Sequence, residues 1–240
     1  MPWRPVGALP LSEQVHQQLL NAIIEGTLSG TLPPERELAA SFQVNRHVIR
    51  EAVKRLQQAN LVEVNQGGAT RILSVHDHAR LDLLPDVIVR DGVIDAGVAR
   101  AVLELRACVG ADAARLCALR SPFVGDRLAA HIPGPTVSGA DLEAGNFAFW
   151  SAIVDGSHNL AYRLSLNTLM AVIDSVGRAV GGAELMEALH EEYRGVDRMK
   201  SLAAAISGGA AEQAHRTAVD ILGAVLSVEE FADLPLDSGI

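Results

Sequence analysis

The chain has 240 residues, which suffices for one large domain or two modest domains that each bury a core. Hydrophobic residues make up 49% of it, but no run of 18 or more uncharged apolar residues could span a bilayer, and the start MPWRPVGALP lacks a charged leader followed by an apolar core. We therefore expect a cytoplasmic protein without a membrane partner. Cys108 and Cys117 suit neither a disulfide framework nor a zinc site.

The net charge of −9 is unevenly distributed along the chain. Residues 1–75 carry seven Lys or Arg and six Asp or Glu, whereas residues 76–240 carry 13 and 23. A nucleic-acid-binding protein needs basic groups only near the phosphates, because only those groups release counterions. The N-terminal part is therefore the candidate for nucleic-acid binding, and the acidic remainder is not.

Three helices are predicted in the N-terminal part. Apolar residues recur at three- and four-residue spacings over Leu11–Ile24. Pro33 and Pro34 favour the first turn of a short second helix, and Asn45 is a suitable cap for a third. The buried stripe of the third helix is expected to be Ile49, Ala52, Val53 and Leu56.

The opposite face of the third helix carries basic residues. Arg46, Arg50 and Lys54 follow one another at intervals of four, with His47 beside them. The segments "LVEV" and "ATRIL", joined by "NQGG", then predict a hairpin. A charged helix face is often only a solvated face, but this one lies on the second helix of a short pair and precedes a hairpin. The arrangement predicts a winged helix-turn-helix domain over residues 1–75, with a recognition helix that reads DNA.

Residues 76–240 are predicted to form an antiparallel all-helical bundle of six or seven helices, so that the protein is mainly α. Breaks such as "RDGVID", "HIPGPTVSG", "DGSHN", "VGG" and "SGG" separate Ala- and Leu-rich segments. The expected helices lie near Leu81–Val89, Ala96–Leu119, Gly125–Ala130, Leu142–Asp155, Leu160–Val180, Ala183–Ser207 and Ala210–Phe231.

The segment "LPPERELAASFQVNRHVIREAVKRLQQANLVEVNQGGATRI" resembles the winged helix of GntR-type bacterial transcription regulators. It contains the family's ERELA, its V-x-R-x-x-x-R-E-A pattern and its L-x-x-x-x-L-V spacing. The resemblance implies that Arg36 and Arg46 meet DNA, that Arg50 reaches a guanine edge, and that Asn45 and His47 flank this contact. An arginine fork matches O6 and N7 of guanine.

The same resemblance implies a role for the tip of the hairpin. Gln66 and Gly67 stand where the family's wing enters the minor groove. The implied partner is a double-stranded operator with inverted-repeat symmetry, bound by a homodimer.

The C-terminal part resembles the effector domain of the FadR subfamily, through "VLELRACVGADAARLCA" and "NFAFWSAIVDGSHNLAYRLSLNTLM". Many members bind a metal through Asp and His residues, but those places hold Asn146, Trp150, Met199 and Ile221 here. These side chains are poor ligands for zinc or manganese, so we expect no metal and no cofactor.

An apolar cavity is therefore expected in the bundle, as in FadR and in the actinobacterial regulators of mammalian-cell-entry operons, which "LDLLPDVIVRDGVIDAGVARAVLELR" also resembles. A fatty-acyl or other lipid-like effector would suit it. The expected ligand-binding residues are Arg106 as an anchor for an anionic head group, together with Asn146, Trp150, Asn167 and Met199.

These expectations amount to an effector-responsive transcription regulator, most simply a repressor of lipid or fatty-acid related genes, and not an enzyme. Two alternatives remain open. The protein could be a ligand-independent DNA-binding dimer whose cavity Trp150 and Met199 fill. It could also be a small-molecule-binding or enzymatic helical module that binds no operator.

Overall fold

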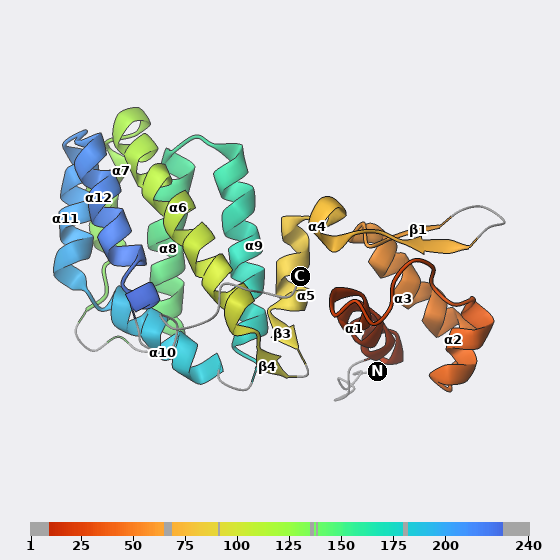
Figure 1. The fold of residues 1–240 in the computed structure, drawn as a ribbon. Coiled ribbons are helices and arrows are strands. Elements are labelled where there is room, and N and C mark those ends of the chain that lie inside the picture. The colour runs from red at the N-terminus through yellow and green to blue at the C-terminus, as the bar shows by residue number, and fades with distance from the viewer. Residues whose placement is uncertain are drawn as a thin grey trace, which may run out of the picture. The chain divides into compact units, whose positions relative to one another are not determined.

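The computed structural model describes residues 10–64, 69–90, 92–134, 137, 139–179 and 182–227. These residues divide into an N-terminal unit that ends at Val87 and a C-terminal unit that begins at Ile88. Both units are mainly helical, and the strands are short (Figure 1). No helix in the described part of the chain is sufficiently long and apolar to cross a bilayer.

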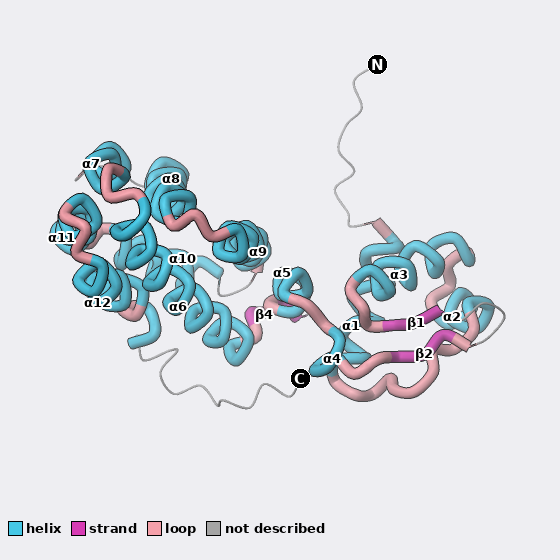
Figure 2. The backbone as a smooth tube through the Cα atoms, turned by 90° about the horizontal axis from the view of Figure 1, so that it is seen from above, coloured by secondary structure: helices cyan, strands magenta, loops and turns pink. Residues whose placement is uncertain are grey.

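The N-terminal unit is a winged helix-turn-helix. Its elements are α1 (Leu11–Ile24), α2 (Glu35–Ser41), α3 (Arg46–Gln58), β1 (Val62–Val64), β2 (Thr70–Ile72), α4 (Val75–His78), the 3-10 turn η1 (Leu81–Leu83) and α5 (Leu84–Val87). Strands β1 and β2 pair antiparallel, with Glu63 opposite Arg71, and lie side by side next to α3 in Figure 2. The unit thus extends beyond the wing to include α4 and α5, so its end lies later than the expected boundary at residue 75.

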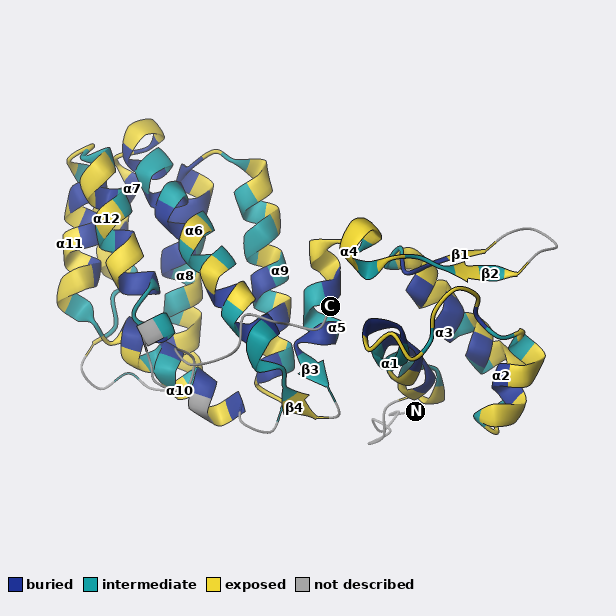
Figure 3. Cartoon of the chain, viewed as in Figure 1, coloured by how far each residue is buried: buried dark blue, intermediate teal, exposed yellow. Residues whose placement is uncertain are grey.

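Helix α3 begins and packs as its sequence pattern predicts. The Asn45 side chain accepts a hydrogen bond from the Val48 amide at 3.1 Å, which caps the first turn. The whole predicted stripe is buried, and this side of the helix appears dark blue in Figure 3. Helix α3 packs mainly on α1 and, to a smaller extent, on α2. Burying this stripe leaves the opposite face of α3 in solvent.

The C-terminal unit is an antiparallel all-helical bundle, preceded by a small hairpin. Its described elements are β3 (Val89–Arg90), β4 (Val93–Ile94), α6 (Ala96–Arg120), α7 (Val124–Leu128), the 3-10 turn η2 (Ala129–His131), α8 (Ala140–Gly156), α9 (Leu160–Val176), α10 (Gly182–Tyr193), α11 (Val196–Ser207), α12 (Ala211–Leu222) and η3 (Val225–Ser227). The long helix α6 packs against α8, α9, α11 and α12 and forms the centre of the core.

Three of the helices predicted from the sequence differ in the structure. The helix expected over 210–231 ends at Leu222, and the 3-10 turn η3 follows it. The helix expected over 183–207 is divided into α10 and α11 at Gly195, whose ψ of 58° is not helical. Glycine weakens a helix interior because its backbone loses more freedom on folding than that of other residues. The helix expected over 81–89 is replaced by η1, the single turn α5 and strand β3, because β-branched residues around Val89 favour an extended backbone and Gly92, at φ 82°, lies in the turn before β4.

Candidate nucleic-acid interface and ligand pocket

The exposed face of α3 gathers basic and polar side chains in the order predicted from the sequence. Arg46, His47, Arg50 and Lys54 are all exposed, and Arg36 is exposed on the neighbouring helix α2. Their exposure follows from the amphipathic pattern, because the buried stripe occupies the other side of the helix. A row of cations on the second helix of a helix-turn-helix has the geometry required to follow a major groove.

Two arginines of α3 differ in their partners. The Arg50 Nε donates to the Glu35 carboxylate of α2 at 2.8 Å, and both side chains remain largely solvent-exposed. The Arg55 guanidinium pairs instead with Glu13 of α1, so this arginine joins two helices of the unit. Among the described residues, Arg46 and Lys54 have no ion-pair partner. No paired carboxylate therefore offsets their attraction to DNA phosphates.

The hairpin forms the wing, but its tip is not described. Arg71 of β2 bonds across the strands to Glu63 of β1 at 3.1 Å. The predicted minor-groove residues, Gln66 and Gly67, lie outside the described residues. Asn45 uses its side-chain oxygen as the helix cap, which leaves its amide NH₂ as the group available to DNA.

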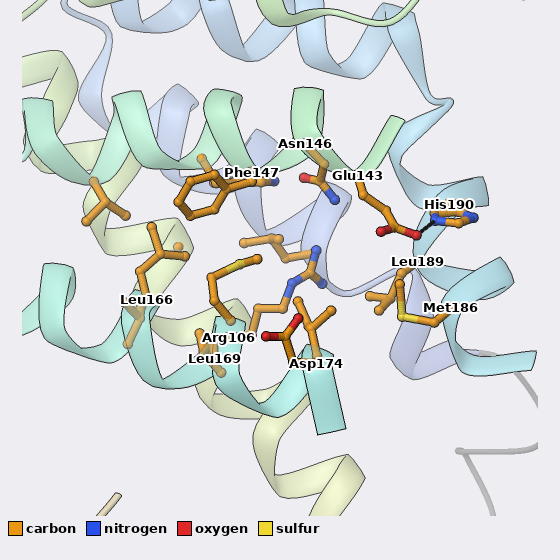
Figure 4. A pocket seen from close by; sticks show the side chains of 17 residues that line it. Arg106, Glu143, Asn146, Phe147, Leu166, Leu169, Asp174, Met186, Leu189 and His190 are labelled. Atoms are coloured by element: carbon orange, nitrogen blue, oxygen red, sulfur yellow. Dashed lines mark hydrogen bonds and ion pairs between the residues drawn. The ribbon is translucent and has the colours of Figure 1, made fainter. Parts of the chain in front are cut away.

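The C-terminal unit contains a pocket of about 150 Å³ between α6, α8, α9 and α10, with a small contribution from α12. The lining residues of α8 and α9 follow helical spacing, and most of them are apolar: Phe147, Trp150 and Val154 from α8, and Leu166, Leu169, Met170 and Ile173 from α9. In Figure 4 the apolar side chains Phe147, Leu166 and Leu169 lie on one side. The polar Asn146, Glu143 and His190 lie on the other side, together with the apolar Met186 and Leu189.

The polar end of the pocket contains charged groups that are partly paired. The guanidinium of Arg106 donates to both oxygens of Glu192, at 3.0 and 2.6 Å, and the two side chains are only 13% and 1% exposed. The His190 Nε2 lies 3.1 Å from the Glu143 carboxylate. The remaining charged lining residue, Asp174, is exposed on α9 and has no ion-pair partner among the described residues.

The structure brings together only part of the expected ligand set. Arg106, Asn146 and Trp150 line the pocket. Asn167 is exposed on α9 and does not line it, because the lining face of that helix passes through 166, 169, 170 and 173. Met199 is 1% exposed within the apolar core and also lies outside the lining, because α11 packs against α6, α7 and α12.

Several pocket residues were not anticipated from the sequence. Glu143 lies three positions before Asn146 and shares its helix face, so helical spacing would have identified it. Asp174 likewise follows Met170 at a spacing of four. Glu192 had no such signal, because it is 86 positions from Arg106 and contacts it only in the folded bundle.

The positions at which related regulators are expected to bind a metal are occupied by other side chains here. In the described part of the chain, no group of three or more His, Cys, Asp or Glu side chains is arranged to hold a metal ion. Asn146 and Trp150 face the pocket, while Met199 and Ile221 are core residues. The donors of these four side chains are an amide, an indole and a thioether, which do not suit a hard or borderline cation.

Comparisons with known proteins agree with this geometry. A family model described as "Bacterial regulatory proteins, gntR family" matches residues 11–72. The HTH-type transcriptional regulator Mce2R of Mycobacterium tuberculosis is 31% identical over 228 residues, which cover 92% of this chain and 92% of that protein. The HTH-type transcriptional repressor NanR of Klebsiella aerogenes is 41% identical over 71 residues, which cover 29% of this chain and 27% of that protein.

Among solved structures, a similar fold is found in Lar, described as controlling the expression of the Listeria monocytogenes agr system. The TM-score is 0.51 at 14% sequence identity, and the match covers 92% of this chain and 96% of that chain. At this identity the likeness concerns the fold.

Proposed function

The chain belongs to the GntR family of bacterial transcriptional regulators, and from this premise we propose that it is a homodimeric, effector-responsive repressor of the FadR type. DNA binding and transcriptional regulation follow from the family, whose members are regulators rather than enzymes. The further parts of the proposal are the dimer, the inverted-repeat operator, the effector and its lipid-like character.

The exposed row on α3 is the observation that supports the DNA-binding mode. In the proposal, Arg50 reads a guanine edge, Arg36 and Arg46 contact the backbone and bases beside it, and Asn45 and His47 flank the contact. We further propose that Gln66 and Gly67, which follow β1 in the sequence, enter the minor groove. Two copies of this unit in a dimer would contact successive major-groove segments, so the operator is an inverted repeat.

The pocket in the bundle supports an effector function. It is mainly apolar and has a few polar groups at one end, which is the usual composition of a small-molecule site. A lipid-like effector fits the apolar side, and genes of lipid or fatty-acid metabolism are the corresponding targets. An effector that binds more tightly to the arrangement of the dimer that does not fit the operator lowers operator affinity, at most by that difference in binding free energy.

Gel-shift titration of operator and scrambled DNA with Arg50→Ala tests the DNA part. Loss of a bidentate arginine contact is expected to reduce discrimination by about 1–3 kcal/mol, which is roughly 5- to 150-fold. The control Arg178→Ala removes the same charge from an exposed position of the C-terminal unit. Unchanged sequence preference in Arg50→Ala would contradict the role proposed for this side chain.

The pocket also bears on the alternative of a ligand-independent dimer. Met199 fills the core, but a volume of about 150 Å³ remains beside Trp150. Lipid extraction of the purified protein followed by mass spectrometry distinguishes the two: a recurrent apolar compound supports a working pocket. Tight ligand binding without an operator footprint would instead favour the module that binds no operator.

A further inference from the structure

We infer that the polar end of the effector is a hydrogen-bond donor, best a protonated amine, and not the anionic head group first expected. This inference rests on the proposed function, because it takes the bundle pocket as the effector site. It follows from the pairing of Arg106, from the acceptors that surround the polar end, and from the charge of the lining.

Arg106 is not free to bind an anion. Its guanidinium donates two hydrogen bonds to Glu192, a carboxylate that is 1% exposed. A carboxylate or phosphate ligand would compete with Glu192 and leave a buried negative charge without its partner. Breaking a buried ion pair in this way is strongly unfavourable. Arg106 therefore serves to neutralise Glu192 and offers little attraction to a second anion.

The buried polar side-chain atom that the described pocket residues leave without a hydrogen-bond partner is an acceptor. The Asn146 Oδ1 is buried and has no hydrogen-bond partner. Asp174 on α9 has no ion-pair partner among the described residues. Glu143 on α8 has only His190, whose imidazole carries at most one positive charge. A buried acceptor without a donor is costly, so a ligand that donates a hydrogen bond satisfies a group that the protein leaves unpaired.

The charge of the lining favours the same class of ligand. Its ionisable members are Arg106, Glu143, Asp174 and His190, and the charge of Arg106 is cancelled by Glu192. The other ionisable lining residues are then two carboxylates, Glu143 and Asp174, and one histidine, His190, so negative groups outnumber groups that can be positive. Figure 4 shows that Glu143 and Asp174 come from different helices, so a cationic group in the pocket would be attracted by carboxylates of both α8 and α9.

The volume limits the apolar part of the ligand. A cavity of about 150 Å³ lined by apolar side chains is of the size that accommodates a benzene molecule. The pocket therefore takes an apolar portion of roughly six carbon atoms. Phe147 lines the pocket and is 40% exposed to solvent, so a longer alkyl chain of the ligand would leave the pocket beside this residue.

The test compares three probes with the same six-carbon chain and different head groups: hexylamine, hexanol and hexanoate at pH 7.5. Binding to the full chain is followed by fluorescence of Trp150, in a Trp3→Phe background that leaves it as the only tryptophan. We expect hexylamine to bind at least about tenfold more tightly than hexanoate, with hexanol between them.

Matched variants assign the effect to the pocket. Asp174→Asn is expected to weaken hexylamine binding about fivefold and to leave hexanol binding unchanged, because only the amine uses the charge. Asp197→Asn removes one exposed carboxylate of α11 outside the pocket and should change neither. Glu192→Gln releases Arg106 and should raise the affinity for hexanoate. If this last variant does not fold, the two aspartate variants still decide the outcome.

The results separate the inference from the proposed function. Tighter binding of hexanoate than of hexylamine to the unaltered pocket would overturn the head-group inference and keep the effector site. An equal loss of hexylamine affinity in Asp174→Asn and Asp197→Asn would also overturn it. Failure of all three probes to bind would remove the effector site itself, and the inference with it.

Discussion

Arg50 and Glu35 are joined across the helix-turn-helix by a hydrogen bond of 2.8 Å from the guanidinium Nε to the carboxylate Oε2. Because Glu35 takes only the Nε, both terminal nitrogens of Arg50 remain available for the O6 and N7 of a guanine. Glu35 therefore orients the arginine that we propose reads a base, although the carboxylate also repels DNA phosphates. These two effects have opposite signs and can be separated by experiment.

Glu35→Gln is expected to lower the ratio of specific to non-specific DNA affinity about two- to fivefold, since an exposed ion pair contributes up to about 1 kcal/mol. Non-specific affinity should rise, because a negative charge near the phosphates is removed. The control is Glu37→Gln on the same helix, which removes the same charge from an exposed carboxylate. Equal specificity ratios for the two variants, measured by competition binding, would show that the Arg50–Glu35 contact has no orienting role.

The Arg106–Glu192 pair should respond very differently to single and double substitution. Arg106→Met leaves the buried Glu192 carboxylate without a partner and is expected to destabilise the protein by about 3–5 kcal/mol. Arg106→Met combined with Glu192→Leu removes both charges and should recover most of this loss. Free energies of unfolding from urea titrations measure both effects. A double variant as unstable as the sum of its single changes would contradict this account.

His16 is expected to make the N-terminal unit sensitive to mild acid. This side chain is buried on α1 with no partner for its Nδ1, and burial lowers its pKa despite the attraction of Asp86. Below the ordinary pKa of 6.5 the unfolded chain therefore binds the proton more readily than the folded chain. Stability should fall as the pH decreases from 7.5 to 5.5, by at most about 1.4 kcal/mol per pH unit.

The variant His16→Leu tests this origin of the acid sensitivity. It removes the titrating group, so the melting temperature of the variant should fall less between pH 7.5 and 5.5 than that of the unaltered protein. His76→Gln, which changes an exposed histidine of α4, is the control and should behave as the unaltered protein. Burial raises the pKa of the Asp86 carboxyl from 3.8, so the folded chain binds this proton more readily than the unfolded chain. Protonation of Asp86 at lower pH therefore adds to stability, whereas protonation of His16 lowers it. An unaltered slope in His16→Leu would exclude His16 as the cause.

The contact of α7 with α11 requires a glycine at position 125. A Cβ placed on Gly125 would lie 2.5 Å from the Ala203 carbonyl oxygen and 2.5 Å from the Ser207 amide nitrogen. Gly125→Ala is therefore expected to destabilise the protein by about 1–3 kcal/mol, although alanine is the better helix former. In the control Gly134→Ala, the nearest described atom outside the chain neighbours of Gly134 would be the Val137 Cγ2, at an ordinary contact distance of 3.9 Å. Equal melting temperatures for the two variants would show that the α7–α11 contact adjusts without cost.

Most of the N-terminal unit could be predicted because its information is local. The buried stripe of α3, the cap at Asn45 and the exposed row from Arg46 to Lys54 depend on spacing within one helix, and spacing is visible in the sequence. The partner of Arg50 was less accessible, because Glu35 lies on another helix and its carboxylate approaches only after α2 and α3 pack.

The residues that line the pocket could be predicted only in part from the sequence. Arg106, Asn146 and Trp150 were expected there and line it, whereas Asn167 and Met199 do not. A resemblance identifies which helices meet, but the face that each helix turns inward depends on its packing. The rotation of α9 places 166 and 170 inside and exposes Asn167, and the rotation of α11 places Met199 in the core.

The sequence by itself determined the winged helix-turn-helix, the helical bundle and the family, because helical periodicity, turn residues and short motifs are properties of neighbouring residues. Only the tertiary structure decided the electrostatics of the pocket, because Arg106 meets Glu192 across 86 positions and the pair cancels the charge that an anionic ligand would need. Charges act through distance in space, and that distance exists only after the chain has folded.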